Sequence, residues 1–86
     1  MQQTSLDAFD QLKQEGSLSK RQEEVYIAIT ELHGATNTEI STYLQIPINT
    51  VTPRTNELVK LGLVKAIADR LCRVTGRRAL VWGVDE

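Results

Sequence analysis

The fold is decided by residues 34–62, which read GATNTEISTYLQIPINTVTPRTNELVKLG. Thr36 and Glu39 form the Thr-x-x-Glu pattern of a capping box, in which each side chain satisfies a backbone N–H at the start of a helix. We expect a short helix from this point to Leu44, followed by a tight turn over residues 45–48. A second helix then ends at Gly62, a residue suited to stopping a helix.

The second of these helices carries its apolar side chains on one face. Val51, Thr55 and Leu58 recur at helical spacing and are expected to face inward. Pro53 leaves the start of this helix open, because proline fits only the first helical turn. If Asn49 caps the helix the conflict is small, whereas a start at Ile48 costs one backbone hydrogen bond.

The residues before Gly34 predict two further helices. Ser19 and Gln22 form another capping box, and the helix that they open should run to about His33 with an apolar stripe facing the core. Gly34 then stands where a left-handed residue ends a helix. Residues 1–16 form an N-terminal helical extension with a thin apolar stripe. This stripe consists of Leu6, Phe9 and Leu12.

After Gly62 the pattern changes from helical to strand-like. Residues 63–68 and 79–84 are typical of two antiparallel strands. In the second strand the alternation places three apolar residues on one face: Leu80, Trp82 and Val84. Residues 69–78 are polar and basic, and we expect them to form a loop between the strands.

The composition is that of one small globular domain. The chain has 86 residues, of which 41% are hydrophobic and 24% are charged. This length leaves no room for a second domain beside residues 17–86. The N-terminal sequence lacks the features of a secretory signal, and no stretch is apolar enough to span a membrane. The single cysteine, Cys72, cannot form an internal disulfide, so a cytoplasmic location is expected.

The sequence lacks the residue sets that catalysis or cofactor binding would need. One histidine, His33, and one cysteine do not make a zinc site. No glycine-rich nucleotide loop and no Ser/His/Asp set is found. We therefore expect no enzyme activity, no metal and no cofactor. Cys72 leaves one alternative open, because the neighbouring arginines could make its thiol reactive. Trp82 is expected to fill the core.

Charge is distributed unevenly along the chain, although the formal net charge is only −1. Residues 1–46 hold three basic and seven acidic residues, a net charge of −4. Residues 47–86 hold seven basic and four acidic residues, a net charge of +3. This asymmetry is a hint of an anionic partner for one face of the molecule.

The order helix, short helix, tight turn, helix and β-hairpin is that of a winged helix-turn-helix. The chain resembles the winged-helix DNA-binding domains of MarR-type regulators and of small phage or prophage proteins. The matching segments span about residues 17–84, and they are residues 18–22, 34–40, 49–54, 57–58, 62–64 and 75–78. The resemblance implies a mostly α (α+β) fold of three core helices and a hairpin wing, with the extra N-terminal helix added. It also implies a transcription regulator, of a phage or other mobile element, that binds double-stranded DNA sequence-specifically.

In such a domain the third core helix lies in the major groove of DNA. Its outward face is short, polar and almost uncharged at the N-terminal end, and asparagine and threonine can hydrogen-bond to base edges. The residues of this helix that we expect to contact DNA are Asn49, Thr50, Thr52, Pro53, Arg54, Asn56 and Lys60. Arg54 has a second interpretation, since it lies at the edge of the buried face and could tie the helix to the strands.

The basic loop and its flanks form the second expected contact with DNA. In the resembling families the hairpin is a wing that follows the phosphate backbone or enters the minor groove. The residues concerned are Arg70, Arg73, Arg77 and Arg78. The alternative is a solvated edge hairpin whose charges prevent aggregation.

Two questions about partners stay open from the sequence. The stripe of Leu6, Phe9 and Leu12 fits either a homodimer that binds two half-sites or a helix that covers its own core. The acidic N-terminal half and the near-zero net charge also fit a winged helix that binds a protein partner and no DNA.

Overall fold

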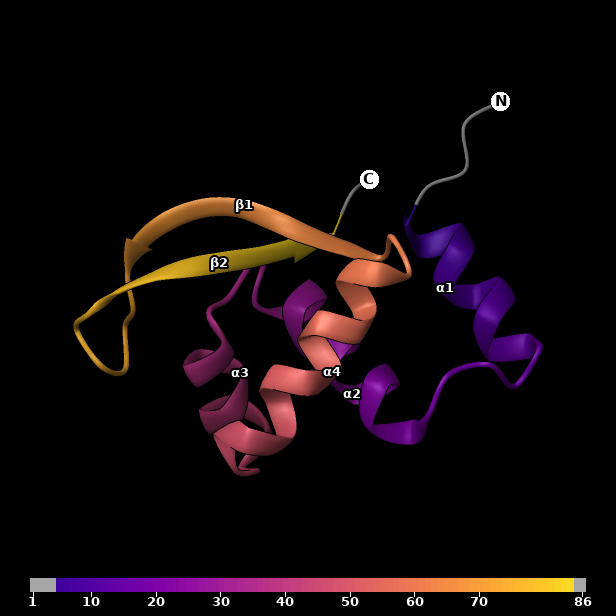
Figure 1. Cartoon of the computed structure of the whole chain (residues 1–86), viewed down its shortest axis with the longest axis horizontal. Coiled ribbons are helices and arrows are strands. Elements are labelled where there is room, and N and C mark those ends of the chain that lie inside the picture. Colours follow the sequence, from indigo (N-terminus) through magenta and orange to yellow (C-terminus); the bar gives the residue numbers. More distant parts are fainter. Residues whose placement is uncertain (1–4, 85–86) are drawn as a thin grey trace.

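The computed structural model describes residues 5–84, with side chains from Asp7 onward. Four helices are followed by two antiparallel strands, so the mixed α+β class predicted from the sequence is confirmed (Figure 1). The elements are α1 (Ser5–Gln14), α2 (Lys20–Glu31), α3 (Asn37–Leu44), α4 (Ile48–Lys60), β1 (Val64–Leu71) and β2 (Arg78–Val84).

Both predicted capping boxes are present. The Ser19 hydroxyl accepts from the backbone N–H of Gln22, and the Gln22 side chain accepts from the backbone N–H of Ser19, which starts α2. Thr36 and Glu39 make the same reciprocal pair at the start of α3. These short local patterns therefore fix where two of the helices begin.

The start of α4 resolves the alternative that Pro53 left open. Pro47 is the N-cap and makes no side-chain capping bond, so Asn49 lies inside the helix and is not its cap. Pro53 is consequently an interior residue, beyond the first turn, where it offers no N–H to the carbonyl of Asn49. The end of α2 also differs from expectation, because His33 itself adopts the left-handed conformation (φ 56°) before Gly34 (φ 102°).

The hairpin is longer than the sequence pattern predicted. Its strands pair from Val64 with Val84 to Leu71 with Arg78, and a β-bulge at Ile67 interrupts the register. Ala35, between α2 and α3, forms an isolated bridge to Trp82, with each backbone N–H donating to the other carbonyl at 3.0 and 2.8 Å. The hairpin is thus attached to the segment between α2 and α3 by main-chain bonds.

The core lies where α2, α3 and α4 meet, and residues of both strands pack against it. Its fully buried side chains include Ile29, Ile40 and Leu58. The ring of Phe9 stacks on that of Tyr26 at a centroid distance of 4.1 Å, which attaches α1 to α2. Trp82 is only partly buried, but it packs against this core as expected.

The elements are spread unevenly along the long axis of the molecule. The hairpin loop, α3 and the N-terminal end of α4 lie in one half of the view, and α1 lies in the other (Figure 1). Within the described part of the chain, none of the helices is long and apolar enough to cross a membrane.

Candidate nucleic-acid interface

Helix α4 presents a buried face and an open polar face, as its sequence predicted. Val51, Thr55 and Leu58 are completely buried. The opposite face is exposed at four of the predicted contact positions: Asn49, Pro53, Asn56 and Lys60. Asn49, Pro53 and Asn56 lie within about 60° of one another around the helix axis, because each residue advances the helix by about 100°. Two uncharged amides therefore stand two turns apart on one exposed face.

The three remaining predicted residues of α4 are partly buried. Thr50 lies in the first turn. Thr52 donates its hydroxyl to the carbonyl of Ile48, so this oxygen is already engaged within the helix. Arg54 forms a paired contact with Glu57, in which Nε and Nη2 lie 2.7 and 3.1 Å from the carboxylate oxygens.

The Arg54 pair connects α4 to α2 and not to the strands. Glu57 also accepts a hydrogen bond of 2.8 Å from the side chain of Gln22 in α2. These donors, Arg54 first, hold the pKa of the Glu57 carboxyl below its usual value. The expected tie from Arg54 to the strands is therefore not seen among the described residues: Arg54 pairs with Glu57 of its own helix, and Glu57 makes the bond to α2.

The hairpin loop carries two arginines whose side chains have no ionic or hydrogen-bonding partner in the part of the chain that the structure describes. Arg73 and Arg77 are exposed, and their side chains form no ion pair or hydrogen bond among residues 7–84. Arg78 pairs with Asp69 at 3.0 Å, but both side chains are largely exposed. Exposed pairs contribute little to stability, so this guanidinium remains exchangeable.

Arg70 differs from the other arginines of the hairpin, because it is held by α3. Its Nη1 and Nη2 donate to the two carboxylate oxygens of Glu39 at 2.8 and 2.9 Å, and Nη1 also donates to the carbonyl of Leu71. Glu39 is only 9% exposed and accepts two further bonds, from the backbone N–H groups of Arg73 and Thr36. The guanidinium of Arg70 therefore faces a protein carboxylate, which the sequence pattern did not reveal.

The surroundings of Glu39 favour its charged form. The hydrogen bond from Arg70 is the largest cause, and it outweighs the burial that would raise the pKa. The backbone N–H groups of Arg73 and Thr36 act in the same direction as Arg70. Together they lower the pKa of the Glu39 carboxyl from 4.5 to about 2. This carboxylate is thus negative throughout the physiological range.

Cys72 is buried and not displayed in an open loop. Its Sγ lies 3.1 Å from Oγ1 of Thr36, and 3% of the residue is exposed. Burial raises the pKa of this thiol. Hydrogen bonds from Thr36 and from the backbone N–H groups of Thr75 and Val74 outweigh it and hold the pKa below its usual value. The idea of an accessible reactive thiol is not supported by this burial.

The residues proposed for a dimer interface lie on α1. The side chain of Leu6 lies outside the described residues. Phe9 is 4% exposed because it stacks on Tyr26 of its own chain, and Leu12 is partly buried against the same core. The side chains of Phe9 and Leu12 therefore serve the chain's own core in this structure, while the dimer itself stays a prediction.

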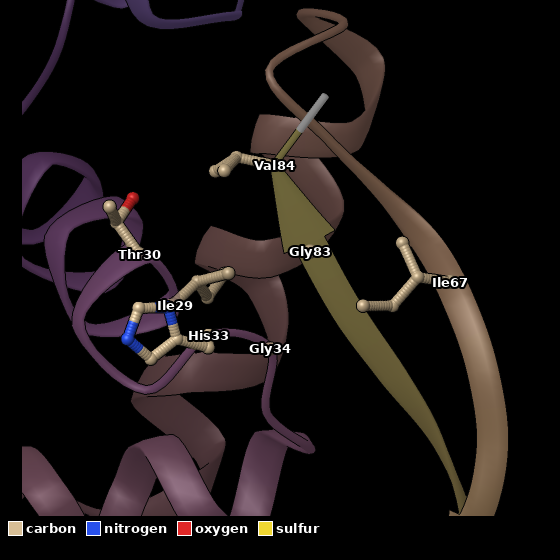
Figure 2. A pocket seen from close by; sticks show the side chains of 7 residues that line it. All are labelled: Ile29, Thr30, His33, Gly34, Ile67, Gly83 and Val84. Carbon is tan, nitrogen blue, oxygen red and sulfur yellow. The ribbon is translucent and has the colours of Figure 1, made fainter. Parts of the chain in front are cut away.

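A small pocket opens between the end of α2 and the hairpin, away from these residues. Figure 2 shows its walls, and its volume is about 200 Å³. It is lined by Ile29, Thr30, His33, Gly34, Ile67, Gly83 and Val84. Ile67 points from β1 toward Gly83, where an added Cβ would lie 2.6 Å from the Ile67 Cδ1 atom. Glycine at position 83 is therefore what lets the bulged strand pack this isoleucine.

No protein-family model matches this chain, and no curated protein matches it.

Proposed function

We propose that this chain is a winged-helix protein that binds double-stranded DNA and regulates transcription in the cytoplasm. In this proposal α3 and α4 form the helix-turn-helix and the hairpin of β1 and β2 is the wing. Its loop, residues 72–77, is called the wing loop below. Helix α4 lies in the major groove, and the wing loop lies along the phosphate backbone.

The observation that carries the proposal is that α4 has an uncharged polar face and that the wing loop, in the same half of the molecule (Figure 1), carries exposed arginine side chains. Asn49 and Asn56 are exposed on α4, and asparagine pairs with adenine through two hydrogen bonds. Arg73 and Arg77 extend from the wing loop without a protein partner among the described side chains. The N-terminal end of α4 and the wing loop lie in the same half of the molecule (Figure 1). Base contacts and phosphate contacts are thereby available together.

A second candidate function is binding of a protein partner without DNA. The observation that favours it is a set of exposed apolar side chains on the hairpin. Leu71, Leu80 and Ile67 are 61%, 48% and 49% exposed. A partner bound there would leave the arginines of the wing loop and the asparagines of α4 without a role.

The first test is fluorescence anisotropy of the chain on a random-sequence duplex at increasing salt. Each phosphate contact releases condensed counterions, so we expect binding with a log–log slope of about −3 to −6. Arg73→Gln and Arg77→Gln should each weaken binding and reduce the slope by about 1. Lys20→Gln is the matched control, because it removes one exposed positive charge from the start of α2 and should leave the slope unchanged.

Two results would overturn the proposal. Absence of binding at low salt removes DNA as the partner. Binding that Lys20→Gln weakens as much as Arg73→Gln or Arg77→Gln would be nonspecific attraction to positive charge, with no defined role for the wing loop. If the chain does not bind DNA at low salt, a protein partner is the remaining candidate. Substitution of Leu71 or Leu80 by serine should then abolish binding of that partner.

A further inference from the structure

We propose that Glu39 and Arg70 form a clamp that holds the wing in its DNA-binding position, so that Arg70 positions the wing and does not itself bind DNA. This inference rests on the proposed function. It assigns opposite tasks to arginines that the sequence presents as equivalent members of one basic segment.

The geometry of Glu39 supports the clamp first. Its carboxylate accepts four hydrogen bonds from two separate parts of the chain. Thr36 belongs to the start of α3, whereas Arg70 and Arg73 belong to the wing, more than thirty residues further along. One side chain thus joins the helix-turn-helix to the hairpin at the base of the wing loop.

The position of Arg73 makes the clamp relevant to DNA. Its backbone N–H is bound to Glu39 at 2.9 Å, while its side chain is exposed and has no hydrogen bond or ion pair among residues 7–84. The wing loop is further closed by hydrogen bonds from Cys72 N–H to the carbonyl of Arg77 and from Gly76 N–H to the carbonyl of Cys72, at 2.7 and 2.8 Å. Fixing Arg73 at its main chain therefore also sets where Arg77 stands.

Arg70 cannot bind a DNA phosphate without giving up hydrogen bonds to Glu39. Both of its terminal nitrogens are engaged by Glu39, and 30% of its side chain is exposed. A bidentate arginine–carboxylate pair is geometrically specific and stronger than a neutral hydrogen bond. The pair of Arg78 and Asp69, at 3.0 Å, joins side chains that are 71% and 55% exposed and is freely exchangeable by comparison.

The decisive experiment compares Glu39→Gln with Asp69→Asn in the DNA-binding assay at several salt concentrations. Both variants remove one negative charge that is paired with a wing arginine. Loss of negative charge alone strengthens DNA binding, and we expect Asp69→Asn to do so by about twofold or more. Glu39→Gln should instead weaken binding by about tenfold. Its amide group places a donor against the Arg70 donors, and affinity falls in proportion to the fraction of molecules with the wing in place.

Substitutions at Arg70 separate positioning from direct contact. Arg70→Gln should weaken binding to a similar extent as Glu39→Gln, with the salt slope unchanged. Arg70→Lys should fail to restore affinity, because an ammonium group cannot make the bidentate pair. If Arg70 were a phosphate ligand, Glu39→Gln would strengthen binding, Arg70→Gln would reduce the slope by about 1, and lysine would substitute for arginine. Those results would overturn the clamp.

Amide hydrogen exchange of the free protein provides a readout that needs no DNA. In Glu39→Gln the amides of Cys72, Arg73 and Gly76 should exchange about tenfold faster or more, while those of Ile29 and Leu58 keep their protection. Unchanged exchange in the wing loop would refute the clamp. If the unsubstituted chain does not bind DNA, this measurement still decides whether Glu39 holds the wing, and only the proposed function fails.

Discussion

At the scale of single residues, the two amides of α4 have the most specific role that we assign. Asn49 and Asn56 are exposed and lie seven residues apart, which places them on one face of the helix. We predict that Asn49→Ala and Asn56→Ala each cost about 1–3 kcal/mol of discrimination between a selected site and a scrambled duplex. Their free energy of unfolding should change by no more than about 0.5 kcal/mol. Competition binding and urea unfolding measure the two quantities.

Equal weakening of binding to all duplexes would contradict the assignment of Asn49 and Asn56 to base contacts. If both variants weaken binding to every duplex by the same factor, these amides carry no sequence information. Lys60→Ala is a useful comparison, because Lys60 is exposed further along α4. A cation that contacts phosphate should weaken binding uniformly across sequences.

The lowered pKa of the Glu39 carboxyl makes the stability of the chain depend on pH. Its pKa is about 2 in the folded protein, below the ordinary value of 4.5. The unfolded chain therefore takes up the proton first as the pH falls. The stabilisation is complete above about pH 5 and is lost between about pH 4.5 and 2, and its size is about 3 kcal/mol.

Urea unfolding at a series of pH values checks this prediction. The loss of stability between pH 5 and pH 2 should be smaller in Glu39→Gln than in the unsubstituted chain, since glutamine does not titrate. Glu15→Gln removes an exposed carboxyl after α1 and is the comparison variant. Equal losses in the Glu39→Gln variant and the unsubstituted chain would mean that Glu39 has no abnormal pKa.

At the scale of elements, α4 carries an unfavourable residue within its exposed face. Pro53 lacks the N–H that would bond to the carbonyl of Asn49, and an interior proline costs a helix about 3 kcal/mol. Pro53→Ala should therefore raise the free energy of unfolding by about 1–3 kcal/mol. Pro47→Ala is the matched control, since Pro47 precedes the helix and its replacement restores no helical bond.

Thermal or urea unfolding of the two proline variants gives the answer. Equal or lower stability of Pro53→Ala would mean that the rigid ring restricts the unfolded chain more than it disturbs the helix. A gain in stability would show that α4 retains proline at an energetic cost, on the face that we assign to DNA.

The elements differ in how far the sequence could predict them. Helices α2 and α3 begin directly after their N-caps, Ser19 and Thr36, because capping boxes are local, and both starts were predicted correctly. The start of α4 depends on Pro47, which caps without a side-chain bond and leaves no comparable pattern. The bridge between Ala35 and Trp82 is a single pair of residues far apart in the chain, so no periodic pattern in the sequence predicts it.

The residues of the candidate site also differ in how far the sequence could predict their role. Exposure of Asn49, Pro53 and Asn56 follows from helical periodicity, because the buried positions of α4 determine the opposite face. The engagement of Arg70 by Glu39 depends on the tertiary fold, which brings the hairpin against the start of α3. Composition marks both Arg70 and Arg77 as basic, and only the structure shows that Glu39 binds the Arg70 guanidinium while the Arg77 side chain has no such partner among residues 7–84.

At the scale of the whole molecule, the small net charge conceals an uneven distribution of acidic and basic residues along the chain. The acidic residues concentrate in residues 1–46, whereas the wing and α4 carry most of the basic residues. In the proposed complex, the half of the molecule that holds α3, the start of α4 and the wing loop faces DNA, and α1 lies in the other half (Figure 1). A chain with a formal charge of −1 can then bind a polyanion through one end.

The most direct test of this arrangement is a two-dimensional NMR titration of the labelled chain with duplex DNA. We predict that the largest amide shifts fall together on residues 48–56 of α4 and on residues 72–77 of the wing loop, while α1 is unaffected. Shifts confined to the exposed apolar residues of the hairpin, or spread evenly over all cationic surface, would contradict it. So would a spectrum that DNA leaves unchanged at low salt.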